Sequence, residues 1–179
     1  GEDDNTGKLD HDLGHLRFKI LDKAYKAYDR ARIKHGRMDP KTIKAQGKMA
    51  DAFSLFKLVP AVMDPILELV RRDMQLVRDQ ERSIRDLCVR KSKMPREVFL
   101  KNYVGNETSV DWIDDMTEKM PEIAERLRKV RVSVRHGNKL IKRVSTRTDM
   151  SIAEIKDLNR RLFLAVGNTR AAKKDMIEA

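Results

Sequence analysis

The amino-acid sequence predicts an all-α protein, a multi-helix bundle with long amphipathic helices. Apolar residues recur at steps of three and four along most of the chain, which is the spacing of one helical face. Only 5% of the residues are aromatic and 37% are charged, and the abundant Lys, Arg, Glu, Leu and Met favour helices over strands. With 179 residues and 40% hydrophobic content, the chain suffices for one sizeable domain or two small ones.

Two helices are expected in the first third of the chain. Apolar residues at helical spacing mark 9–35, and Gly36 is a suitable stop. Asp39 followed by Pro40 predicts the start of the next helix, because aspartate caps free N–H groups and proline fits the first turn. This second helix is expected to end at Pro60.

Three further helices are expected in the central part of the chain. The longest amphipathic stripe runs over 66–88, and Pro65 starts or adjusts that helix. A short helix over 95–104 should end at Gly105, which begins the clearest loop. Another brief helix should hold the single tryptophan, Trp112, as a core residue, with an exposed partner anchor as the alternative.

The strongest physical signal is the charge of the helix expected over 121–147. The segment contains nine basic residues and only two acidic ones, Glu122 and Glu125, so its charge is +7. Gly137 should weaken the middle of this helix. Several bases recur at steps of three or four, so they are candidates to follow a phosphate backbone or an acidic partner. A solvated helix surface is the alternative. The candidate contact residues are Arg131, Arg135, Lys139, Lys142, Arg143 and Arg147.

The C-terminal part should begin with a capping box. Ser151 and Glu154 have the spacing at which each side chain satisfies the other's free backbone N–H, so a helix should start there. Gly167 predicts a joint before a last helical segment over 169–179. A second basic cluster, again with a solvated face as its alternative, comprises Arg160, Arg161, Arg170, Lys173 and Lys174.

Nothing in the sequence argues for catalysis, a metal or a cofactor. His11 and His15 share a helical face, but no cysteine, third histidine or zincin glutamate accompanies them. Phosphate-binding glycine loops, serine elbows and Cys-His pairs are absent from the sequence. We therefore expect a protein that is not an enzyme.

Charge and cysteine content bound the partners and the compartment. The formal charge is +11, which predicts a negatively charged partner: nucleic acid, an acidic protein face or an anionic membrane. Cys88 is the only cysteine, so a reducing cytoplasm is the expected compartment and a small core residue its expected role. The sequence has no run of about 18 apolar residues, which disfavours membrane insertion.

Several short strings, in their order and spacing from about Leu9 to the end, resemble those of primary sigma factors of proteobacteria. Singly they are short, but together they cover most of the chain. They are Gln80-Glu81-Arg82, Leu87-Cys88-Val89, Lys93-Met94-Pro95, Gly105-Asn106-Glu107-Thr108-Ser109 with Trp112, Ile155-Lys156-Asp157-Leu158-Asn159-Arg160-Arg161, and Ala172-Lys173-Lys174-Asp175-Met176-Ile177-Glu178-Ala179.

The resemblance implies a division of the chain. Residues 1–8 would be the remnant of an acidic linker, 9–166 the variable helical insert of the sigma factor, and 167–179 the start of its second conserved region. The promoter-reading residues of the family would then lie beyond Ala179. In one departure from the family pattern, the helix over 121–147 is far more basic than the mixed-charge helix expected there.

The resemblance also implies a function. The parent protein would be a transcription initiation factor that directs core RNA polymerase to promoters. This fragment would contact core polymerase, whose clamp on the largest subunit the family binds, and promoter DNA would be met through the full-length protein. The alternative is a free-standing basic helical protein that binds nucleic acid through phosphate contacts.

Overall fold

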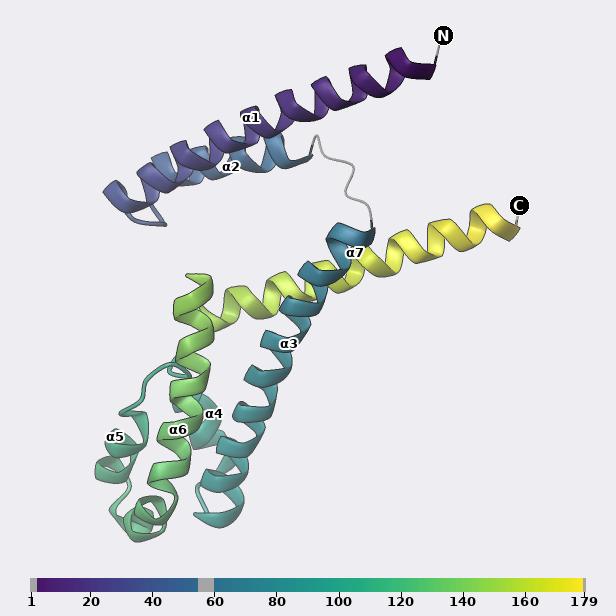
Figure 1. The fold of residues 1–179 in the computed structure, drawn as a ribbon. Helices are drawn as coiled ribbons and strands as arrows, with labels where there is room; N and C mark the ends of the chain where they lie inside the picture. The colour runs from purple at the N-terminus through teal and green to yellow at the C-terminus, as the bar shows by residue number, and fades with distance from the viewer. Residues whose placement is uncertain (1–2, 55–59, 179) are drawn as a thin grey trace. The chain divides into compact units, whose positions relative to one another are not determined.

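The computed structural model confirms the all-α prediction. It describes residues 3–54 and 60–178, although the side chains of 3–11, 54, 60–63, 165, 166 and 168–173 lie outside the description. Within those ranges the chain forms helices and no strand (Figure 1). Their order is α1 (Asp3–His35), α2 (Pro40–Ser54), α3 (Pro60–Arg85), a π-helical turn (Asp86–Lys91), α4 (Arg96–Tyr103), α5 (Trp112–Lys119), a 3₁₀ turn (Pro121–Ile123), α6 (Ala124–Thr148) and α7 (Ile152–Glu178). The chain divides into two compact units, residues 1–62 and 63–179.

The first unit is a hairpin in which α1 and α2 lie side by side (Figure 1). Gly36 allows the turn because its φ of +82° lies in the left-handed region that glycine tolerates. The Asp39 carboxylate accepts a hydrogen bond of 2.8 Å from the Lys41 N–H, which confirms the predicted cap of α2. The buried Thr42 hydroxyl closes the turn by donating to the Gly36 carbonyl at 2.7 Å.

The second unit holds the main hydrophobic core. Side chains from α3, α4, α5, α6 and the first turn of α7 meet there. Trp112 is buried, as predicted, and its ring packs edge-on against Phe99 and Tyr103. Cys88 is also buried as predicted, and burial raises the pKa of its thiol to about 12. It is therefore a neutral packing residue at physiological pH.

Gly137 does not interrupt α6, which runs without a break from Ala124 to Thr148. A Cβ atom at this position would lie 2.9 Å from the Cδ1 atom of Ile84 on α3. Ile84 is itself buried, so it has little room to move. Glycine is present because α3 and α6 pack too closely for a larger residue, and this packing offsets its helix cost of about 1 kcal/mol.

The capping box at the start of α7 is present as predicted. The Ser151 N–H donates to a Glu154 carboxylate oxygen at 2.7 Å, and the Glu154 N–H donates to the Ser151 hydroxyl at 3.2 Å. The predicted joint at Gly167 is wrong, because α7 continues unbroken to Glu178. One glycine costs a helix only about 1 kcal/mol relative to alanine, which a helix of 27 residues can absorb.

The start of α1 differs from the sequence prediction, and the start of α3 decides between the two roles left open for Pro65. α1 begins at Asp3, six positions before Leu9, so the segment assigned to a linker is largely helical. Acidic residues favour a helix N-terminus through the helix dipole, which accounts for the earlier start. α3 begins at Pro60, a favourable first helical residue, and includes Pro65 in its second turn. The predicted end of the second helix next to Pro60 lies outside the described residues.

Candidate functional site

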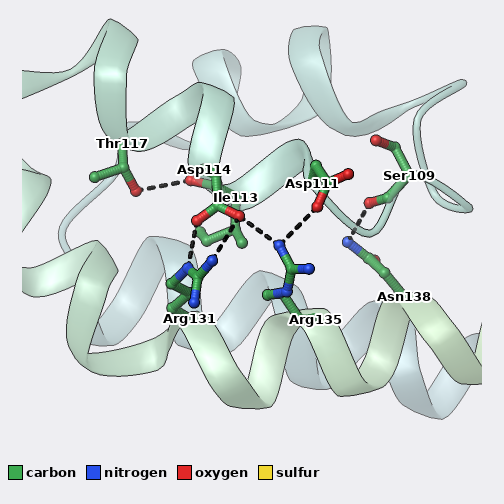
Figure 2. Close-up of polar contacts among 8 residues, drawn as sticks. All are labelled: Ser109, Asp111, Ile113, Asp114, Thr117, Arg131, Arg135 and Asn138. Carbon is green, nitrogen blue, oxygen red and sulfur yellow. Dashed lines mark hydrogen bonds and ion pairs between the residues drawn. The ribbon is translucent and has the colours of Figure 1, made fainter.

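The candidate contact residues of α6 fall into two groups, and the first group is already engaged within the protein. Two nitrogens of Arg131 donate to the Asp114 carboxylate of α5, one of them at 3.1 Å (Figure 2). Arg135 also donates to Asp114, and it donates to the Asp111 carboxylate at 2.7 Å. Arg147, near the end of α6, pairs with Asp73 of α3. These three arginines therefore tie α6 to neighbouring helices.

The local sequence explains why the aspartates meet α6 at this point. Asp111 precedes the first residue of α5 and Asp114 lies in its first turn, where carboxylates stabilise the positive end of the helix dipole. The neighbouring Asn138 of α6 fixes the same loop, since its side-chain amide donates to the Ser109 carbonyl at 2.9 Å (Figure 2). The Tyr103 hydroxyl donates to the Asn138 amide oxygen at 2.9 Å, which completes a buried network.

The electrostatics of the ion pairs between Asp114 and the two arginines favour the ionised aspartate. The hydrogen bond from Arg131 holds the pKa of the Asp114 carboxyl below its usual range, with Arg135 acting in the same direction against partial desolvation. The Arg131 pKa is raised mainly by the same hydrogen bond. Both residues keep their charges through the physiological range, so the pairs act as structural contacts.

Replacing Asp114 with asparagine is expected to lower the free energy of unfolding by about 1 kcal/mol at pH 7, a value limited by solvent screening of these partly exposed pairs. Because the folded-state pKa is depressed, the ion-pair stabilisation is fully present above the unfolded pKa of about 3.9, declines below it and is lost as pH falls through the folded-state pKa. Urea titrations at pH 7 and pH 3 measure both effects. The advantage of the parent over Asp114→Asn should be smaller at pH 3 than at pH 7, and a difference of the same size at both pH values would contradict the assignment.

The second group remains exposed. Lys139, Lys142 and Arg143 are all solvent-exposed, and no ion pair is found for them within the described part of the chain. Lys139 and Arg143 lie one helical turn, about 6 Å, apart on α6. Arg128, which sequence reasoning did not select, is exposed and lies eleven residues before Lys139, so close to three helical turns place it on the same face. The eleven-residue interval between Arg128 and Lys139 was the feature of the sequence that could have identified Arg128 as part of this face.

The second basic cluster is only partly described. Arg160 and Arg161 both pair with the Asp157 carboxylate, at 2.7 and 2.8 Å, in pairs that are largely exposed. Lys174 contacts Glu178 at 3.6 Å. The side chains of Arg170 and Lys173 lie outside the described residues, so this cluster stays a prediction.

The described residues offer no alternative site chemistry. Among them no three His, Cys, Asp or Glu side chains gather as metal ligands would, and the side chain of His11, which shares a helical face with His15, lies outside the description. No helix in the ranges searched combines the length and apolar character that a membrane crossing requires. Basic surface is thus the chemical feature that the described part of the chain presents most clearly.

Comparison with known proteins relates the chain to a family model and to curated relatives, of which one is described below. Residues 2–145, which include α1 to most of α6, match the family model of the "Sigma-70, non-essential region". A protein of Neisseria gonorrhoeae, "RNA polymerase sigma factor RpoD", is 24% identical to this chain over 167 residues. The aligned part is 93% of this chain but only 26% of that relative. The chain therefore spans about a quarter of the length of this relative.

Proposed function

Because the chain belongs to the family of the sigma-70 non-essential region, we propose that it forms part of a primary sigma factor, the subunit that directs core RNA polymerase to promoters. The match of residues 2–145 to the family model is the observation that carries this proposal. The relative named as a sigma factor supports it over nearly the whole chain. The proposed role of the fragment is that of a transcription initiation module without catalytic activity of its own.

Core RNA polymerase is the proposed main partner, through the clamp of its largest subunit. Proteins dock on one another through large, rigid and shape-complementary surfaces, and the second compact unit supplies a well-packed helical scaffold for that purpose. Such a contact should survive moderate salt, since apolar and hydrogen-bonded interfaces depend less on screening than phosphate contacts do.

Upstream promoter DNA is the proposed secondary partner of α6. Lys139, Lys142 and Arg143 are exposed cations on one helix, and cations of this kind contact phosphates and release counterions. α6 carries no aromatic residue on which bases would stack. The contact would therefore position DNA without reading its sequence.

A salt titration of the purified chain against two immobilised targets tests both proposals. The targets are core RNA polymerase and a promoter-length DNA duplex, each measured from about 50 to 200 mM salt. We expect saturable polymerase binding throughout this range. DNA binding should be weaker and should fall steeply as salt rises.

Either half of the experiment can overturn the proposal. Loss of polymerase binding at every salt concentration would remove the docking role and favour the alternative of a basic helical protein that binds nucleic acid alone. DNA binding that does not depend on salt would contradict phosphate contacts by α6.

A further inference from the structure

A groove in the second compact unit has two different rims. It lies between α3 and α4 with its following loop, reaches the first turns of α7, and has a volume of about 310 Å³. The buried rings of Phe99 and Tyr103 form its floor, stacked with their centroids 4.8 Å apart. Aromatic residues thus support the groove but are too buried to serve as exposed stacking platforms.

One rim is cationic. Arg78 and Arg82 lie one turn apart on α3, line the groove and are exposed, and no ion pair is found for either within the described residues. Their backbone positions differ by about 6 Å along the helix axis. Arg85, on the next turn of the same rim, already forms an ion pair with Asp86 at 3.3 Å. The first two arginines therefore remain available for a partner's carboxylates.

The other rim is apolar. Leu100, in the last turn of α4, is 45% exposed, and Val104, just after α4, is 67% exposed. The Val104 N–H donates to the Leu100 carbonyl at 3.3 Å, so the two residues are also one turn apart. Leaving both in water is unfavourable, and covering them contributes free energy in proportion to the apolar area removed.

The groove does not suit a nucleic-acid backbone. Glu107, which lines it, is only 9% exposed, and Glu81 holds Lys156 by an ion pair of 2.7 Å. A continuous row of phosphates along the groove would meet these carboxylates, whereas a partner helix can place its carboxylates at Arg78 and Arg82 and present uncharged side chains elsewhere. A phosphate backbone would also leave Leu100 and Val104 uncovered.

We propose that this groove binds an acidic amphipathic helix of a partner protein. Carboxylates four residues apart on that helix would face Arg78 and Arg82, since their spacing matches one helical turn. Aliphatic side chains on the adjacent stripe would cover Leu100 and Val104, as in other complexes where a helix fills a groove. This contact is separate from the exposed cations of α6 and does not depend on the proposed DNA contact.

A defined peptide tests the proposal. The probe is a fluorescent helix of about 16 residues that carries glutamates at i and i+4 beside a leucine stripe, titrated with the full chain and followed by anisotropy. We expect saturable binding. The double change Arg78→Glu and Arg82→Glu should weaken it about 30-fold or more, and Leu100→Gln with Val104→Gln about tenfold.

A matched control separates the groove from general charge. Lys139→Glu with Arg143→Glu makes the same charge change on exposed residues outside the groove and should weaken peptide binding at most about threefold. Circular dichroism and thermal melts check each fold, and Arg78→Gln with Arg82→Gln replaces the reversed pair if that variant is unstable. No saturable binding, equal binding of a peptide with serines for leucines, or equal weakening by the control would each overturn the proposal. Duplex DNA that binds through Arg78 and Arg82 would do the same and make the groove a phosphate site.

Discussion

Replacement of Trp112 with alanine is expected to lower the free energy of unfolding of the second compact unit by about 3–5 kcal/mol, the usual cost of removing a buried aromatic side chain. Only 4% of Trp112 is exposed. Its ring centroid lies 5.7 Å from that of Phe99 and 4.9 Å from that of Tyr103. The substitution therefore removes core volume and two edge-to-face ring contacts.

A hydrogen bond adds to this cost. The Trp112 indole N–H donates to the Asn102 carbonyl at 2.9 Å, across the loop between α4 and α5. Urea unfolding followed by circular dichroism measures the change, because the variant lacks the chain's only tryptophan and so its fluorescence signal. Trp112→Phe should cost less, since it keeps a ring. Val132→Ala, at a position 78% exposed, should change stability by less than about 0.5 kcal/mol. A decrease below about 1 kcal/mol for Trp112→Ala would contradict a central core role.

Features encoded by neighbouring residues could be predicted from the sequence. The capping box of Ser151 and Glu154 acts over three residues, and its signal is complete within the segment itself. The turn at Gly105 is similar, because a φ of +88° strongly favours a residue without a Cβ atom. The burial of Trp112 followed from its apolar neighbours at helical spacing. In each case local chemistry decides the structure.

Features that depend on which helices meet could not be predicted. The spacing of Arg131 and Arg135 indicates a shared face but not that α5 would present Asp114 to it, 17 and 21 positions away in sequence. Arg147 finds Asp73 across 74 positions. Gly137 resembles a weak point in its own segment because Ile84, its packing partner, belongs to another helix. Spacing rules describe one helix at a time, and these contacts arise between helices.

Helix packing also divides the basic residues of α6, because some are paired with aspartates of other segments and others are exposed. The largest expected effect on binding comes from replacing the exposed ones. The triple change Lys139→Gln, Lys142→Gln and Arg143→Gln should weaken binding of the chain to duplex DNA about 10²–10³-fold at about 50 mM salt. The slope of log affinity against log salt should fall by about 2.7, or about 0.9 for each phosphate that the variant no longer neutralises. Fluorescence anisotropy with a labelled duplex over a range of salt concentrations measures both quantities.

The control triple changes Arg131, Arg135 and Arg147 to glutamine, which removes the same charge from the same helix. Because these arginines are held by Asp114, Asp111 and Asp73, their replacement should lower the melting temperature while the salt slope changes by less than about one. Equal decreases of slope in the two triples would mean that DNA responds to the total charge of α6 rather than to its exposed face. A larger decrease in the control would mean that the arginines leave their aspartates to meet phosphate, and that the internal ion pairs compete with DNA.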